Sequence, residues 1–108
     1  EVAMAYRFRL HQRFSLSSAL VYERGFREGR GTVSDLSPTG WHISGNLPLQ
    51  RGEVCAMRVV LPTGSRVLVS AGIVRWVRGA EYGIETLVVD DRSRVHLEGY
   101  LQTRITDR

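Results

Sequence analysis

The stretch that decides the fold is residues 54–77, VCAMRVVLPTGSRVLVSAGIVRWV. Both halves are rich in β-branched residues, which favour strands, and the Pro-Thr-Gly-Ser segment between them is typical of a turn. The stretch therefore predicts a β-hairpin with a long second strand. Gly72 lies within that strand, and an interior glycine often marks the bulge or bend that a curved sheet needs.

Shorter runs on either side of this hairpin predict further strands. Upstream we expect strands near Leu16–Arg24 and Arg30–Leu36, joined by a turn at GFREG, and another in WHISGNL, residues 41–47. Downstream, Glu81–Val89 predicts a last strand. Short strands separated by Gly, Pro and Asp at regular spacing indicate an all-β barrel or sandwich.

The C-terminal segment has a different periodicity. Apolar residues recur there at intervals of three and four, which predicts an amphipathic helix that packs on the barrel: Leu97, Tyr100, Leu101 and Ile105. Asp90 or Asp91 can cap it. We expect one domain over 16–105, preceded by a flexible N-terminal arm, 1–15, because YRFRLHQRFS is arginine-rich and does not alternate.

The composition of the chain narrows the classes of partner that it can bind. All 15 basic residues are arginine, against 11 acidic residues, so the formal charge is +4 and anionic partners are favoured: nucleotides, nucleic acid or acidic lipid. The lone Cys55 cannot form an internal disulfide, which suggests the cytoplasm. No apolar run approaches the roughly 20 residues that span a bilayer. Because residue 1 is Glu and not Met, the interpretation that the chain is a segment of a longer protein stays open.

The most specific local pattern is D-x-S-x-x-G at residues 35–40, DLSPTG. In an extended chain Asp35 and Ser37 point to one face, where a carboxylate and a hydroxyl can address one flat ligand. The carboxylate can accept from the N–H groups of a guanine Watson–Crick edge, and Gly40 allows a sharp turn. The alternative is a plain turn, in which Asp and Ser bond to their own backbone.

A second pattern is R-x-x-x-R at Arg9 and Arg13. Each guanidinium can bind a phosphate in a bidentate manner or donate to guanine O6 and N7. Its specificity is low, because Arg104 and Arg108 repeat the spacing, and the alternative is a pair of solvated charges. Trp76 is a weaker candidate for base stacking, and core packing or a simply exposed aromatic are its alternatives.

The order of these patterns along one β-meander resembles the PilZ family. The corresponding stretches are RLHQR, DLSPTGWHISG, GIVRW and YGIETL, and they extend over most of the chain. The resemblance implies a six-stranded antiparallel β-barrel with a C-terminal α-helix, whose outer face binds cyclic di-GMP. Arg9 and Arg13 would contact phosphates and guanine Hoogsteen edges, and Asp35 and Ser37 another guanine edge. Many members carry a second arginine where Phe8 stands here.

No catalytic arrangement is recognisable. The histidines and Cys55 show no metal-ligand spacing, so we expect no enzyme, no cofactor and no metal site. We expect a receptor whose arm and surface change when the messenger binds, and which acts on a downstream protein or a fused domain. Two alternatives stay open: a PilZ-like domain that works only through protein contacts, and a small barrel that binds single-stranded nucleic acid, which is the less favoured of the two.

Overall fold

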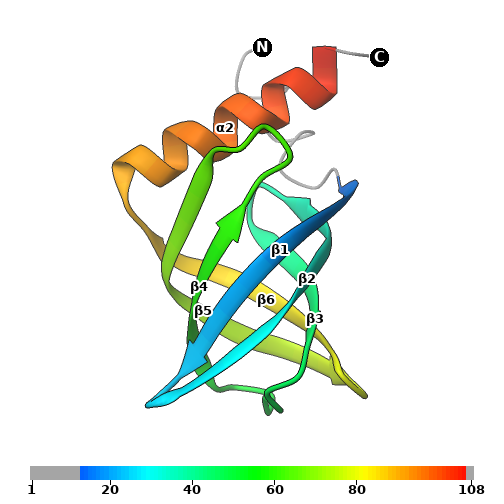
Figure 1. The fold of residues 1–108 in the computed structure, drawn as a ribbon, viewed down its shortest axis with the longest axis vertical. Coiled ribbons are helices and arrows are strands. Elements are labelled where there is room, and N and C mark those ends of the chain that lie inside the picture. Colours follow the sequence, from blue (N-terminus) through cyan, green and yellow to red (C-terminus); the bar gives the residue numbers. More distant parts are fainter. Residues whose placement is uncertain (1–12, 107–108) are drawn as a thin grey trace.

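The computed structural model describes residues 13–106, which form a closed β-barrel with one helix (Figure 1). The elements are β1 (Phe14–Arg24), β2 (Arg27–Ser37), β3 (Gly40–Gly45), β4 (Val54–Val60), β5 (Arg66–Arg78), β6 (Glu81–Val89) and α2 (Asp91–Thr106). Neighbouring strands are antiparallel and follow the order β1-β2-β3-β6-β5-β4, in which β4 closes the barrel on β1. The expected fold class, six antiparallel strands and a C-terminal helix, is confirmed.

The first two strands begin earlier than the sequence-based expectation. β1 begins at Phe14, so the last two residues of the expected arm belong to the barrel. β2 begins at Arg27, because the GFREG turn is tighter than expected: Arg24 pairs directly with Arg27. Gly25 makes this tight turn possible with a φ of 62°, a conformation in which other residues are strained. Most of the expected arm, residues 1–12, lies outside the described residues.

The bulge expected at Gly72 is present. The pairing of β5 with β6 shifts register between Ala71 and Gly72. A Cβ at this glycine would lie 2.6 Å from the Cγ2 atom of Ile84, too close for an unshifted side chain. The glycine therefore lets β6 approach β5 where the barrel wall bends.

The helix begins as the sequence predicted. The Oδ1 atom of Asp90 accepts a hydrogen bond of 2.7 Å from the backbone N–H of Ser93, so Asp90 is the N-cap. The hydrogen bonds from Ser93 lower the pKa of Asp90. Leu97, Tyr100 and Leu101 are buried against the barrel core, and α2 lies across one end of the barrel (Figure 1).

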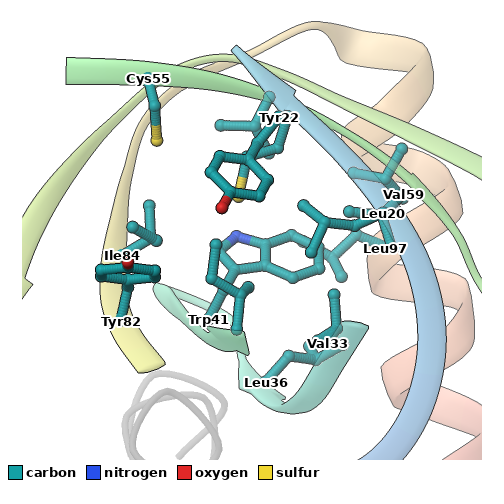
Figure 2. Close-up of a cluster of buried hydrophobic side chains, with 14 of the residues drawn as sticks. Leu20, Tyr22, Val33, Leu36, Trp41, Cys55, Val59, Tyr82, Ile84 and Leu97 are labelled. Carbon is teal, nitrogen blue, oxygen red and sulfur yellow. The ribbon is translucent and has the colours of Figure 1, made fainter. Parts of the chain in front are cut away.

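The core fills the barrel with inward side chains from every strand (Figure 2). Trp41 and Tyr22 are the largest fully buried side chains. The Tyr22 hydroxyl donates to the carbonyl of Leu47 at 2.6 Å and accepts from its N–H at 2.8 Å, which satisfies a polar group that would otherwise be costly to bury. Trp41 Nε1 donates to Thr86 Oγ1 at 2.8 Å. Every polar atom of these two rings is thus paired.

Cys55 should make the fold less stable at alkaline pH. Its buried side chain is 2% exposed, and burial raises the pKa of the thiol from 9.0 to about 11. The folded state therefore holds the proton more tightly than the unfolded chain. This contribution to stability is complete below pH 9 and is lost as the pH rises toward 11. Urea unfolding followed by circular dichroism should show a lower free energy of unfolding at pH 10 than at pH 8.

The control for this prediction is Cys55→Ala. Burial also raises the pKa of Tyr22, so the variant should keep part of the alkaline loss and not all of it. An alkaline loss as large in Cys55→Ala as in the parent chain would contradict the role of the thiol.

Candidate functional site

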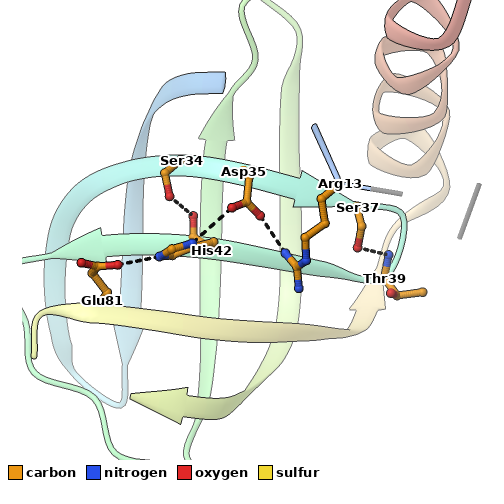
Figure 3. Close-up of polar contacts among 7 residues, drawn as sticks. All are labelled: Arg13, Ser34, Asp35, Ser37, Thr39, His42 and Glu81. Atoms are coloured by element: carbon orange, nitrogen blue, oxygen red, sulfur yellow. Dashed lines mark hydrogen bonds and ion pairs between the residues drawn. The ribbon is translucent and has the colours of Figure 1, made fainter. Parts of the chain in front are cut away.

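The polar cluster of interest begins at Asp35, near the end of β2. Arg13, the residue immediately before β1, places its Nη1 atom 2.7 Å from Asp35 Oδ1 (Figure 3). The other carboxylate oxygen, Oδ2, lies 3.2 Å from His42 Nδ1. Each oxygen of Asp35 thus has one partner, and the side chain remains 23% exposed. The structure brings together two of the predicted site residues, Arg13 and Asp35, in direct contact.

His42 extends the cluster to a third strand. Its Nε2 atom lies 2.8 Å from Glu81 Oε1, at the start of β6 (Figure 3). His42 pairs with Asp35 across the β2-β3 hairpin, and with Gly83 across β3 and β6. The imidazole is therefore held between two carboxylates, which orient its ring.

The sequence-based search for functional residues missed His42 and Glu81. His42 could have been found, because a hairpin with Ser37 opposite Gly40 necessarily sets Asp35 opposite His42. Glu81 could not, since its approach depends on the pairing of β3 with β6, which lie far apart in the sequence.

Ser37 has a local hydrogen bond. It is 5% exposed, and its Oγ atom accepts from the N–H of Thr39 at 3.4 Å, as in the plain-turn alternative (Figure 3). Asp35 instead bonds to distant residues, so the plain-turn alternative does not describe it. Both residues lie on β2, two positions apart, as expected.

Gly40 has a different structural role from the one expected. The sequence predicted a conformational role in a sharp turn, but Gly40 is not among the glycines with a positive φ. A Cβ at this position would lie 3.1 Å from the carbonyl oxygen of Ile84 on β6. The absence of a side chain therefore lets β3 and β6 pair closely beside the loop, which brings His42 toward Glu81.

Trp76 lies on the outer wall of the barrel beside His42. It does not belong to the buried core, so the core-packing alternative is wrong. Its ring makes an edge contact with the His42 imidazole, with centroids 5.0 Å apart and planes at 74°, and the Arg78 guanidinium lies 5.5 Å from the ring centroid. A half-buried aromatic ring thus adjoins the Asp35 cluster. The other predicted contact, Arg9, falls outside the described residues.

Gly83→Ala should displace Trp76. The indole lies against Gly83, and a Cβ there would overlap its Nε1 and Cε2 atoms. The methyl group should push the ring away from His42 into water, and tryptophan emission should shift to longer wavelength. Gly99→Ala is the matched control, because a Cβ at Gly99 meets nothing within 4 Å. Emission that is the same in both variants would contradict the packing of Trp76 on Gly83.

The site carries both signs of charge. Arg75 pairs with Glu85 at 2.6 Å, in addition to the Arg13, Asp35 and Glu81 charges. Within residues 13–106 no three Asp, Glu, His or Cys residues gather closely enough to hold a metal ion. Within the described residues, no helix is long and apolar enough to cross a bilayer.

Comparison with known proteins identifies the class. The model of the PilZ domain family matches residues 7–103, and the chain therefore belongs to the PilZ domain family. This confirms the resemblance carried by RLHQR, DLSPTG and GIVRW. PilZ domains are binding domains known as receptors for cyclic di-GMP.

Two solved structures share the fold. The Bacillus subtilis inhibitor of motility, MotI/DgrA, is similar with a TM-score of 0.75 at 16% identity, over 89% of this chain and 50% of that one. The PilZ domain of CeSA from a cellulose synthesizing bacterium is similar with a TM-score of 0.66 at 14% identity, and the match covers 85% of this chain and 96% of that domain. The chain thus spans about half the length of the motility inhibitor. A sequence comparison with curated proteins found no match.

Proposed function

We propose that this domain is a cyclic di-GMP receptor that catalyses no reaction, and that the ligand lies on the outer wall around Asp35, His42 and Trp76. The observation that carries the proposal is the 2.7 Å contact between Arg13 and Asp35. It joins the second arginine of R-x-x-x-R to the acid of D-x-S-x-x-G, although 22 positions separate them in the sequence. Two motifs that a PilZ site uses together are therefore adjacent in space.

The chemistry of these groups suits a guanine dinucleotide. A carboxylate accepts two hydrogen bonds from the N1–H and N2–H groups of guanine, and an arginine fork binds a phosphate or guanine O6 and N7. In the free protein Arg13 and Asp35 satisfy each other. When the ligand binds, its contacts replace this exposed ion pair. The replacement costs little free energy, since such pairs contribute only about 0.2 to 1 kcal/mol.

Arg9 and Trp76 complete the proposed site. Arg9 supplies the second guanidinium of the arm, and the indole of Trp76 offers a face on which a base can stack. Gly40 and Ser37 shape the loop, since Gly40 permits the close pairing of β3 with β6 and Ser37 bonds to Thr39. A ligand held by the arm and the barrel together would then change the surface presented to a downstream protein or fused domain in the cytoplasm.

The carboxylates around the site argue against general binding of single-stranded nucleic acid. Asp35, Glu81 and Glu85 all lie on this wall and offset the charges of neighbours such as Arg13 and Arg75, so the wall lacks the positive excess that binds a phosphate backbone. A compact ligand with guanine edges can use the carboxylates as acceptors, whereas a polynucleotide gains little from them.

Calorimetric titration with cyclic di-GMP tests the function, with cyclic di-AMP as the matched control. We expect saturable binding of the guanine ligand, much weaker binding of the adenine ligand, and a shallow salt dependence. Adenine lacks the O6 acceptor and the N1–H and N2–H donors of guanine, so discrimination should be sharp. Absence of heat at high micromolar cyclic di-GMP would favour the protein-contact alternative, and steep salt dependence with oligonucleotide binding would favour the nucleic-acid alternative.

A further inference from the structure

A second concave surface lies on the other side of the barrel. This groove has a volume of about 920 Å³ and is formed by β1, β4, the first part of β5 and the start of α2, with a contribution from β2. In the closed order of strands, β4 and β1 lie opposite the β3-β6 pair that carries His42 and Glu81 (Figure 1). None of the proposed nucleotide-binding residues that the structure describes lines it. We call it the β1–β4 groove.

The floor of the β1–β4 groove is aliphatic. Leu68 on β5 and Val60 on β4 are 43% and 45% exposed, although side chains of this size are usually buried. Ala19 and Val21 of β1 line the same surface. These residues point outward because their neighbours Leu20, Val59 and Val67 point into the barrel. The groove thus exposes several apolar side chains side by side.

Four arginines that line the groove form a rim around this floor: Arg30, Arg58, Arg66 and Arg92. Arg30 and Arg58 share one carboxylate, Glu28, at 3.8 Å and 3.4 Å.

The other two arginines of the rim have no such partner. Among residues 13–106, Arg66 and Arg92 form no ion pair. Asp90, the acidic residue that lines the groove, accepts the capping bond from Ser93 and also interacts with the charge of Arg92. The four arginines still outnumber the two carboxylates beside them, Glu28 and Asp90, so the rim carries an excess of positive charge.

We infer that the β1–β4 groove docks a segment of a partner protein that combines aliphatic with acidic side chains. The aliphatic floor would bury the apolar side chains of the segment, and the arginine forks would bind its carboxylates in a bidentate manner. This docking surface is independent of the proposed nucleotide site.

Other occupants fit the groove less well. Among the described residues its lining contains no Phe, Tyr or Trp, and the His96 ring is held by its bond to the Arg66 carbonyl, so a nucleic acid would find little surface on which to stack its bases. A second copy of the chain carries the same formal charge of +4 and offers no general charge complementarity. A flat bilayer does not match a concave surface flanked by a helix. The acidic and aliphatic segment is the class that satisfies both the floor and the rim.

Selection from a phage-displayed library of random peptides tests this inference. The parent chain is the bait, and enriched peptides are then synthesised with a fluorescent label and measured by anisotropy. We expect enriched peptides to contain both acidic and aliphatic residues. The double variant Arg66→Glu/Arg92→Glu should weaken their binding by about tenfold or more, because two favourable charge contacts become repulsive. Leu68→Ser should weaken it as well.

Arg51→Glu is the matched control, since Arg51 is exposed and does not line the groove. It should leave peptide affinity within about twofold of the parent value, as rim charges far from a contact contribute little. Two hydrogen bonds connect α2 to β5: Leu68 N–H donates to Ser93 Oγ, and His96 Nδ1 bonds to the Arg66 carbonyl. Both use backbone atoms of β5, so the variants should keep their circular dichroism spectra.

Three results would overturn the inference. One is enrichment of peptides without acidic residues, and another is equal loss of affinity in Arg51→Glu and in the double variant. The third is the absence of any enriched peptide together with binding of a single-stranded oligonucleotide or of phosphatidylserine vesicles that the double variant removes. Each of these is independent of whether cyclic di-GMP binds.

Discussion

Asp35→Ala is expected to lower the affinity for cyclic di-GMP by tenfold or more. The carboxylate can accept two hydrogen bonds from a guanine edge, and a lost hydrogen bond to a charged group typically costs about 1.5 to 3 kcal/mol. The substitution also frees Arg13 and His42, which the carboxylate holds at 2.7 Å and 3.2 Å. Calorimetry on the purified variant measures the change directly.

Two further variants separate the possible causes of such a loss. Asp35→Asn keeps one oxygen acceptor without the charge and should lose less affinity than Asp35→Ala. Arg13→Ala should also lose tenfold or more, because it removes the other half of the contact that carries the proposal. Asp91→Ala removes a carboxylate that is 99% exposed at the start of α2 and serves as the matched control. Parent-like affinity in both Asp35→Ala and Arg13→Ala would rule out the proposed site.

Trp41→Ala is expected to destabilise the barrel by about 3 to 5 kcal/mol, as truncation of a large buried aromatic usually does. Trp41 is 1% exposed, and its indole lies at the centre of the core (Figure 2). No neighbouring strand can move inward to fill the resulting cavity, because a closed barrel fixes the distance across its interior. The variant would also leave Thr86 Oγ1 without the 2.8 Å bond from Nε1.

Urea unfolding followed by circular dichroism measures this loss. Trp41→Phe keeps most of the volume and should lose less. Leu87→Ala, on an outward side chain that is 49% exposed, should change the free energy of unfolding by no more than about 0.5 kcal/mol. A midpoint for Trp41→Ala that matches that of Leu87→Ala would contradict the central place of Trp41. Because Trp41 lies between Gly40 and His42, a large loss would also show that the site loop is anchored in the core.

The sequence predicted the strands well where local signals were strong. The hairpin of residues 54–77, its turn at Pro-Thr-Gly-Ser and the Glu81–Val89 strand depend on β-branched residues and turn formers close together in the chain. The first strand begins two residues before the expected start at Leu16. The second was predicted to begin too late, at Arg30, since the arginine and glycine residues after Gly25 mask its alternation. The spacing of the short strands favoured a barrel or sandwich, and the resemblance to PilZ implied six strands. The particular pairing of β1 with β4 that closes the barrel leaves no mark in local sequence.

The same distinction between local sequence and tertiary structure applies to the site. Sequence by itself determined the chemical groups, the Asp35 acceptor and the Arg13 donor, because their type and spacing can be seen in the linear chain. Only the tertiary structure decided that His42 lies between Asp35 and Glu81, that Trp76 lies outside the core, and that four arginines surround an aliphatic groove. These arrangements arise from strand pairings between residues distant in sequence, and such pairings exist only once the barrel is closed.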